Sequence, residues 1–334
     1  MKFDAILPTL PLTAIPNLAR AAESAGFSAI WTNETQHEAF LPHALIAEHT
    51  QHLNHGTAVA IAFARSPGSL AYTAWDLAAA SKGRFLLGLG TQVRAHIERR
   101  FGVDWPESPV GKLRETVHAL RALWSSWQTG ERLNFRGDYH KLTLMTPFFN
   151  PGPIEHPEIP IYLAGVNTGL CRLAGEVAQG FHAHPLHSAD YLAQTVRPAI
   201  EAGARKVGRT AADIQLTVTA FVVTHPSQAD EVRSQIAFYA STPSYRPVLT
   251  MHGWGDTADL LGALSRRGAW DELPALIDDE MLDTFAVVAP PEDLASAIKA
   301  RYAGLADRLM IYRAFDPDDI ESFWAPLLKD MADA

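Results

Sequence analysis

The chain lacks several features that would assign it to other protein classes. Cys171 is its only cysteine among 334 residues, which excludes an internal disulfide and a cysteine-based zinc site. No stretch reaches the roughly eighteen apolar residues that would span a bilayer. The net charge is −9 and there is no long basic or acidic run, which argues against nucleic acid as the main partner. We therefore expect the protein to bind neither membranes nor nucleic acids.

The beginning of the chain, MKFDAILPTL, lacks the long apolar region and the small-residue cleavage site of a signal peptide. Together with the single cysteine, this predicts a cytoplasmic protein. There is no low-complexity segment, tandem repeat or charge-rich linker, so we expect residues 1–334 to form one domain. That length is large for an average domain but ordinary for a single α/β barrel.

Short apolar runs alternate with helical patterns along the chain, which is typical of parallel βαβ units. Eight segments are predicted as strands, at 3–7, 28–31, 56–63, 84–89, 159–163, 181–184, 214–223 and 309–312. Eight more are predicted as helices, at 11–25, 42–50, 67–81, 113–127, 167–179, 191–203, 292–302 and 318–331. The fold class is therefore α/β, and eight strands indicate a (β/α)8 TIM barrel.

Two segments exceed a minimal barrel, and we interpret both as insertions. Residues 133–146, after strand 4, resemble a hairpin that turns at Arg136-Gly137-Asp138. Residues 241–283, before the last barrel helix, form a long insert that contains proline and tryptophan. Long inserts in compact domains are often lids or interface elements.

The segment GRFLLGLGTQVRAHIERRFG, residues 83–102, contains the most informative strand end. Gly88 and Gly90 flank Leu89, and the polar residues Thr91 and Gln92 follow at once. Glycine lets the backbone bend sharply and lets a flat ligand approach the main chain. Barrel enzymes carry their chemistry on polar residues that directly follow a strand. An ordinary strand-to-loop turn would explain the same pattern.

The second strand is followed by a polar segment, TNETQHEAFLP. His37 is the residue type best suited to exchange protons near neutral pH. Glu34 could orient His37 or bind a substrate hydroxyl. A solvated loop with an incidental histidine is the alternative interpretation.

The third and fifth strands suggest surfaces for a ring and for a phosphate. The third strand, HGTAVAIAFARSP, is small and apolar around Ala58, which suits contact with a flat ring but also a plain barrel strand. The fifth strand runs into a glycine-rich turn, GVNTG at 165–169, that opens a helix. A helix N-terminus presents free N–H groups and a positive dipole end, so it can bind phosphate. A simple N-cap by Asn167 or Thr168 is the alternative.

Histidines gather in two places, namely His49, His52 and His55, and His182, His184 and His187. An HxH pair at a strand end is a metal signature in some barrel hydrolases, but there it opens the barrel. Here the pair lies past mid-chain without a clear second set of ligands, so we expect no metal site. The first group is expected at a helix end and the loop that follows it.

Taken together, five segments resemble the bacterial luciferase-like monooxygenase superfamily, and within it the deazaflavin-dependent (coenzyme F-420) oxidoreductase branch. They are ETQHEAFLP, GTAVAIAFARSP, GRFLLGLGTQVRAHIERRFG, YLAGVNTGLCRLAGEVAQG and YASTPSYRPVLTMHGW. The resemblance covers nearly the whole chain. It implies that a flavin or deazaflavin ring lies in the barrel mouth. It also implies that a bulge with a non-prolyl cis peptide, near Ala58 and Val59, backs this ring.

The resemblance also implies roles for individual residues. Cofactor contacts would come from Gly90, Thr91 and Gln92 at the ring or ribityl chain, and from Gly165, Val166, Asn167 and Thr168 at the phosphate. His37 would be the active-site histidine, with Glu34 beside it, and His96 could reach the substrate. The sequence departs from the pattern in having no polar side chain at the expected bulge. It also has no separate signature for the polyglutamate tail of F-420, so FMN remains an open alternative.

Three functions follow from these observations. The main hypothesis is an oxidoreductase that transfers a hydride between C5 of coenzyme F-420 and a small organic substrate, while the protein orients the reactants. The second is an FMN-dependent monooxygenase supplied by a separate cofactor reductase, and the third is a flavin-binding protein without turnover. Trp31, Phe40 and the aromatic residues of the insert suggest an apolar or ring-bearing substrate. By resemblance alone, we expect a homodimer.

Overall fold

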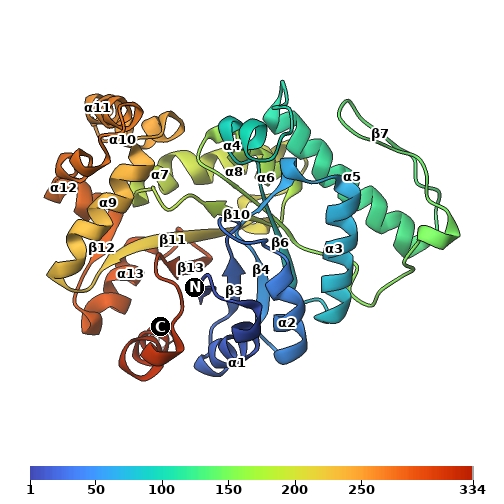
Figure 1. Ribbon diagram of the computed structural model, residues 1–334, viewed down its shortest axis with the longest axis horizontal. Helices are drawn as coiled ribbons and strands as arrows, with labels where there is room; N and C mark the ends of the chain where they lie inside the picture. Colours follow the sequence, from blue (N-terminus) through green and yellow to red (C-terminus); the bar gives the residue numbers. More distant parts are fainter. Residues whose placement is uncertain (333–334) are drawn as a thin grey trace.

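The computed structural model describes residues 1–332, in which parallel strands form a barrel surrounded by helices (Figure 1). The halves of the first strand pair with the last and the second strands, so the sheet closes on itself. The predicted (β/α)8 TIM barrel is therefore confirmed. The barrel strands are β1 (Lys2–Phe3) with β2 (Ala5–Ile6), β3 (Ala29–Thr32), β4 (Asn54–Thr57) with β5 (Ala60–Ile61), β6 (Phe85–Gly90), β9 (Ile161–Gly165), β10 (Gly180–Ala183), β11 (Gln215–Val223) and β13 (Arg308–Ile311).

Two of the predicted strands are interrupted. The first breaks at Asp4, whose buried carboxylate accepts hydrogen bonds from Arg308 Nε and Nη2 at 2.7 and 2.8 Å and from Trp31 Nε1 at 2.8 Å. The third breaks at Ala58 and Val59, between β4 and β5. A buried charged pair needs such complete hydrogen bonding to remain inside a core. Asp4 thus joins the first, second and last strands across the barrel interior.

The helices that surround the barrel follow the strands in chain order. Ser66 caps the third of them by accepting the N–H of Ser69, and the first ends at Gly26, whose φ of 95° suits glycine. These helices are α1 (Ile15–Ala25), α2 (Leu41–His49), α3 (Pro67–Ala80), α4 (Arg94–Arg99), α5 (Pro109–Thr129), α6 (Thr168–Val177), α7 (Ala189–Tyr191), α8 (Arg197–Lys206), α9 (Ala229–Ala240), α13 (Leu294–Tyr302) and α14 (Ala325–Ala332).

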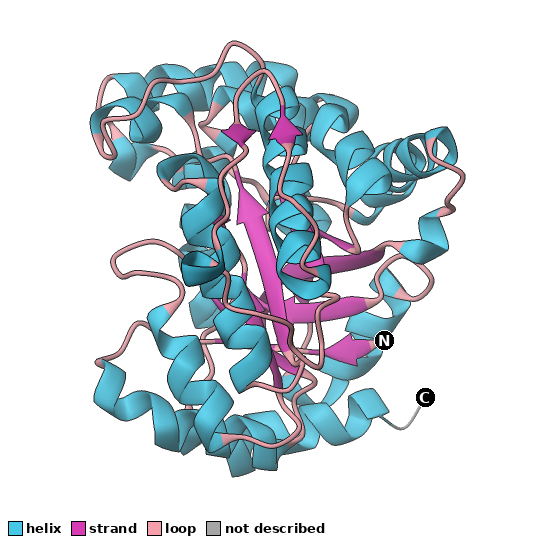
Figure 2. Ribbon diagram, turned by 90° about the vertical axis from the view of Figure 1, so that its right-hand side faces the viewer, coloured by secondary structure: helices cyan, strands magenta, loops and turns pink. Residues whose placement is uncertain are grey.

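Both predicted insertions are present. The hairpin β7 (Phe135–Arg136) and β8 (Lys141–Leu142) lies outside the barrel beyond α5, at the right of Figure 1 and the top of Figure 2. Its tip is held by Glu115, which accepts the N–H groups of Asp138, Tyr139 and His140. The insert between α9 and α13 is helical and contains α10 (Arg246–Met251), α11 (Gly255–Arg266) and α12 (Asp279–Phe285), followed by the strand β12 (Ala286–Val288).

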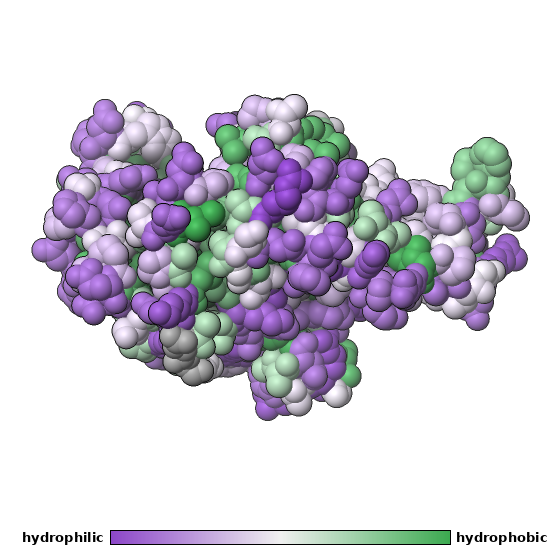
Figure 3. Space-filling model, turned by 90° about the horizontal axis from the view of Figure 1, so that it is seen from below, coloured by the Kyte–Doolittle hydropathy of each residue, from purple (hydrophilic) through white to green (hydrophobic). Residues whose placement is uncertain are grey.

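Two apolar clusters stabilise the fold. The larger one fills the space between the barrel and its helices. The smaller one fills the barrel interior and consists of Ala29, Trp31, Leu86, Tyr162 and Met310. The face seen in Figure 3 is mainly hydrophilic, with a projecting apolar group at the end where Figure 1 places the hairpin segment. Within residues 1–332, no helix has the length and apolarity needed to cross a bilayer.

Candidate active site

The carboxyl ends of the barrel strands bring most of the expected site residues to one end of the barrel, which we call the barrel mouth. Glu34 and His37 follow β3, Ala58 and Val59 follow β4, and Thr91 follows β6. Residues 165–168 connect β9 to α6. Parallel strands with short connections produce this convergence, which is why barrel enzymes carry their sites there.

The interruption of the third strand contains a cis peptide bond between Ala58 and Val59. The non-prolyl cis peptide expected from the family resemblance is therefore confirmed at that position. The Ala58 N–H donates to Thr32 O at 2.7 Å, and Ala60 resumes pairing opposite Leu89. Ala58 and Val59 are half-buried, whereas Thr57 and Ala60 beside them are buried. The bulge thus presents two small apolar residues to the barrel mouth.

The glycines of β6 make room for the neighbouring strand. A Cβ on Gly88 would lie 1.7 Å from Thr57 O, and one on Gly90 would lie 2.5 Å from Val59 Cγ2. Thr57 Oγ1 also donates to Gly88 O at 2.6 Å and accepts the Gly88 N–H at 3.0 Å. The space that we attributed to a ligand is therefore occupied by the chain itself at these two positions. The two glycines thus let the bulge lie close to β6, and a direct contact of Gly90 with the cofactor stays a prediction.

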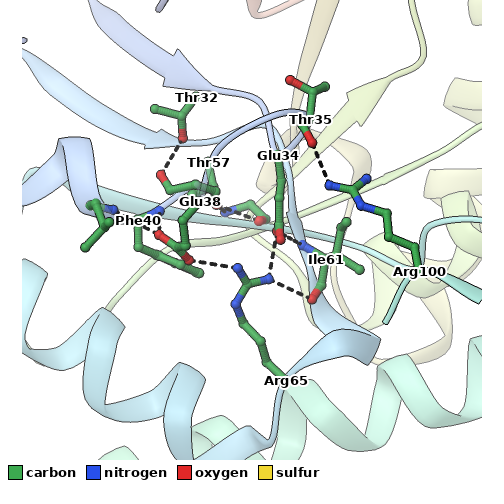
Figure 4. Close-up of polar contacts among 12 residues, drawn as sticks. Thr32, Glu34, Thr35, Glu38, Phe40, Thr57, Ile61, Arg65 and Arg100 are labelled. Carbon is green, nitrogen blue, oxygen red and sulfur yellow. Dashed lines mark hydrogen bonds and ion pairs between the residues drawn. The ribbon is translucent and has the colours of Figure 1, made fainter. Parts of the chain in front are cut away.

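Glu34 supports the bulge and does not contact His37. Its Oε2 accepts the Ile61 N–H and a hydrogen bond from Arg65 Nη1, both at 2.7 Å (Figure 4). Arg65 Nη2 also donates to Glu38 Oε1 at 2.7 Å. Burial alone would lower the pKa of Arg65, but the two carboxylates raise it. This network ties the loop after β3 to β5.

His37 lies in the exposed loop between β3 and α2. It lines a small pocket of about 70 Å³ together with Leu7, Thr32, Thr35 and other residues of the loops after β2 and β3. Its imidazole has no hydrogen-bond partner among residues 1–332. The His37 side chain is therefore open to solvent, while the Glu34 carboxylate is bonded to Ile61 and Arg65.

The loop after β6 lies against the loop that carries His37. Arg100 Nη2, just beyond α4, donates to Thr35 O at 2.6 Å (Figure 4). Gln92 adopts a positive φ of 60°, and its Oε1 accepts the Val93 N–H at 2.9 Å. His96 is exposed on α4, and its imidazole has no hydrogen-bond partner in the described part of the chain. The structure thus places the segments of His37 and His96 in contact, without a bond between the two histidines.

The turn before α6 retains free N–H groups. Asn167 does not cap the helix with its side chain, and its carbonyl accepts the N–H groups of Leu170 and Cys171. The N–H groups of Thr168 and Gly169 have no acceptor within residues 1–332. The simple side-chain N-cap is therefore absent at Asn167, and the first turn fits the phosphate that the sequence pattern indicates.

A histidine and three tyrosines line the opposite side of the mouth. His184, directly after β10, stacks on Tyr245 with ring centroids 4.2 Å apart and packs edge-on against Tyr239 at 4.6 Å. The hydroxyls of Tyr239 and Tyr312 are 2.6 Å apart. The sequence pattern indicates His184 only as a possible metal ligand. No group of three or more histidine, cysteine, aspartate or glutamate side chains in the described residues could hold a metal.

Two further histidines, His43 and His55, form a buried pair beneath the loop that carries His37. Thr32 Oγ1 donates to Ala39 O at 2.9 Å, so His43 Nε2 donates to Thr32 Oγ1, also at 2.9 Å. His43 Nδ1 then accepts from His55 Nδ1 at 3.1 Å. The expectation that His55 lies in a loop is wrong, because it is a fully buried residue of β4. Burial lowers the pKa of His43 to about 3, which keeps this pair neutral.

Comparison with known proteins shows which family the chain belongs to. The sequence model of the family described as luciferase-like monooxygenase matches residues 3–308. An uncharacterized protein of Mycobacterium tuberculosis is 44% identical over 310 residues, which cover 89% of this chain and 91% of that protein. The F420-dependent glucose-6-phosphate dehydrogenase of Microbacterium testaceum is 26% identical, with 90% and 87% covered.

Solved structures share the fold throughout their length. The coenzyme F420 dependent tetrahydromethanopterin reductase from Methanopyrus kandleri superimposes with a TM-score of 0.77 and 20% identity, covering 98% of this chain and 97% of that one. The oxygenating constituent of 3,6-diketocamphane monooxygenase from Pseudomonas putida, in complex with FMN, gives 0.69 and 17%, with 99% and 98% covered. The same barrel therefore occurs in proteins of both cofactor classes.

Proposed function

Because the chain belongs to the luciferase-like monooxygenase family, we propose that it is an oxidoreductase that binds coenzyme F-420 at the barrel mouth. It transfers a hydride between C5 of the deazaflavin and a small organic substrate. The observation that carries the choice of F-420 is the relative from Microbacterium testaceum, whose name states F420 dependence and which aligns over 90% of this chain. FMN with oxygen chemistry is the alternative within the same family.

The proposed cofactor contacts follow the geometry of the mouth. The free N–H groups of Thr168 and Gly169 bind the phosphate, because they point from the positive end of α6. The half-buried Ala58 and Val59 back the ring, and Thr91 lies at its edge. When bound, coenzyme F-420 supplies or takes up the hydride.

The protein's own groups handle the proton. His37 is exposed beside this site and exchanges the proton that accompanies the hydride. Glu34 acts on the site indirectly, since its carboxylate is engaged with Ile61 and Arg65 and thereby holds β5 in place. His96 remains a candidate for substrate contact from the loop after β6.

The test is a parallel fluorescence titration of the apoprotein with F-420 and with FMN, on the wild type and two variants. Gly169→Asp places a negative charge at the first turn of α6, where it stabilises the helix but repels phosphate. We expect it to weaken F-420 binding by about tenfold or more, which corresponds to about 1.4 kcal/mol. Gly169→Ala is the matched control, because its Cβ would meet only Val110 Cγ2, at 3.5 Å.

Each outcome of the titration has a distinct meaning. Tight binding of F-420 alone, sensitive to Gly169→Asp, supports the proposal and directs a screen of enones, alcohols and nitro compounds. Tight binding of FMN alone favours the monooxygenase, and binding of neither overturns the cofactor assignment. F-420 binding without turnover of any compound in the screen would indicate a flavin-binding protein.

A further inference from the structure

His184 is positioned to face the barrel mouth. Side chains alternate along a strand, so residues two apart point to the same side. His182, two residues earlier on β10, has its ring inside the barrel, 4.6 Å from the ring of Trp31 and 5.2 Å from that of Tyr162. His184 therefore lies one layer above the barrel interior, on the side of the barrel mouth.

The structure determines which nitrogen of His184 carries the proton. The backbone N–H of Leu186 donates to His184 Nδ1 at 3.1 Å, so Nδ1 is an acceptor and the neutral ring carries its proton on Nε2. Burial lowers the pKa of His184 to about 3, which keeps the ring neutral. Nε2 has no hydrogen-bond acceptor among the described residues, and the half-buried side chain leaves this atom partly accessible to solvent. It is thus an uncommitted N–H donor.

The ring of His184 is held in one orientation by its aromatic neighbours. Tyr245 lies against one face, with an angle of 22° between the rings, and Tyr239 packs at 82°. Tyr239 is in turn fixed by the hydroxyl of Tyr312, which directly follows β13. We call His184, Tyr239, Tyr245 and Tyr312 the aromatic wall. A donor fixed in this way loses little entropy when it binds an acceptor.

The aromatic wall lies across the mouth from the bulge at Ala58 and Val59. The barrel order runs from β4 through β6, β9, β10, β11 and β13 to the first strand. The wall occupies the sector from β10 to β13, and β11 at its centre is four strands from β4 in either direction. A flat ring backed by the bulge would therefore turn its free face towards the wall, and a substrate would lie between the two.

We propose that His184 donates its Nε2–H to the oxygen of a carbonyl substrate, which becomes the alcohol oxygen when the hydride is added. The tyrosines of the wall pack against the apolar part of the same molecule. This inference rests on the proposed function. Reduction adds a hydride to the carbonyl carbon, the C=O electron pair moves to the oxygen, and the oxygen takes one proton. The neutral His184 stabilises the growing charge, and the solvent-exposed His37 delivers the proton.

The experiment compares wild type, His184→Gln and His184→Phe. The glutamine amide nitrogen occupies the position of histidine Nε2 and keeps a donor, whereas phenylalanine keeps a ring without a donor. Nitrogen-15 NMR of histidine-labelled protein at pH 7 first tests the Nε2–H tautomer of His184. Titration then gives the F-420 dissociation constant, and reduction of acetone, cyclohexanone and benzaldehyde by reduced F-420 gives kcat and KM.

We expect the Nε2–H tautomer, an F-420 dissociation constant within about twofold of wild type in both variants, and selective loss of kcat/KM. A hydrogen bond to a developing charge contributes about 1.5–3 kcal/mol, so His184→Phe should lose about tenfold to a hundredfold. His184→Gln should retain most of the activity, which a purely structural role would not predict. Urea unfolding of both variants confirms that they are folded.

Four results would overturn the inference. They are an Nδ1–H tautomer of His184, equal kcat/KM in all three proteins, the same loss of kcat/KM in both variants, and the absence of carbonyl reduction by wild type that binds F-420 normally. The last result leaves the proposed function intact and rejects only the substrate class. Weakened F-420 binding in His184→Phe, restored in His184→Gln, would place the oxygen acceptor on the cofactor instead of the substrate. Failure of the wild type to bind F-420 would remove the proposed function itself.

Discussion

At the scale of single residues, Gly90 illustrates how a strand makes room for the bulge beside it. A Cβ at this position would lie 2.5 Å from Val59 Cγ2, closer than side-chain contacts allow. We expect Gly90→Ala to lower the free energy of unfolding by about 1–3 kcal/mol, as overpacking does in other cores. Gly68→Ala is the matched control, since the nearest atom to its Cβ is 3.9 Å away. Urea denaturation of both variants measures the difference, and equal stability would contradict this account of Gly90.

Glu34 offers a second prediction at this scale, because its role is structural in our interpretation. Its side chain is 6% exposed and bonds to both Ile61 and Arg65. Glu34→Ala leaves the buried Ile61 N–H without its acceptor and removes one acceptor from Arg65. We therefore expect the free energy of unfolding to fall by about 1–3 kcal/mol. Glu34→Gln keeps an acceptor for Ile61 and should lose less. If thermal and urea denaturation found both variants as stable as wild type, a direct role at the substrate would be the better explanation.

Residue roles could be predicted from the sequence only where they depend on local order or on a family resemblance. The cis peptide position at Ala58 and Val59 was accessible in this way, because it follows from aligned segments. The partner of Glu34 was not, because Arg65 lies 31 residues further along the chain. His184 was visible in the sequence, but its proton position depends on the Leu186 N–H, which only the folded turn reveals.

At the scale of elements, the loop 33–39 that carries His37 is supported from outside by the residue that follows α4. Arg100 donates to Thr35 O at 2.6 Å, a contact on the protein surface. We expect Arg100→Ala to increase hydrogen exchange severalfold in peptides covering 33–40, while peptides covering β6 stay unchanged. Arg99→Ala, one residue away and also exposed, is the control. Equal exchange in the two variants would mean that the loop is ordered by other contacts.

Strands and helices could be predicted where hydrophobic runs were long and were bounded by glycine or proline. All eight strand positions were identified, and Gly26 ends α1 as expected, since glycine at a positive φ stops a helix. The breaks at Asp4 and at Ala58 and Val59 were not visible as changes in hydrophobic pattern. The helices of the insert are short and separated by 3-10 turns, so their order depends on contacts with α9 and the barrel. The helix α9 itself was missed, although Val232, Ile236 and Ala240 have helical spacing.

At the scale of the whole molecule, the buried histidines couple the fold to pH. Burial lowers the pKa of His43, His182 and His184 to about 3 and that of His187 to about 4. They come from different elements, namely α2, β10 and the segment before α7. Burial raises the pKa of Asp4 despite its bond to Arg308. This raised pKa stabilises the folded state in acid, opposite to the histidines, but it comes from a single group. Burial also lowers the pKa of His55 well below its ordinary value, so five histidines dominate the response to acid.

The sign of this response follows from proton binding in the two states. In the unfolded chain a histidine takes up its proton near pH 6.5, whereas four of the buried histidines do so in the folded state only near pH 3 to 4, and the pKa of His55 is also well below its ordinary value. The unfolded state thus binds more protons below pH 6.5, and each histidine removes about 1.4 kcal/mol of unfolding free energy per pH unit. We expect stability to be flat from pH 8 to about 6.5 and to fall steeply between about 6 and 4. Urea denaturation at pH 7.5, 6.5, 5.5 and 5.0 measures the slope, and His182→Gln should reduce it by about a fifth, with exposed His52→Gln as the control. A free energy of unfolding that stays constant down to pH 5 would mean that water reaches these rings, and that the donor assigned to His184 is not held neutral by burial.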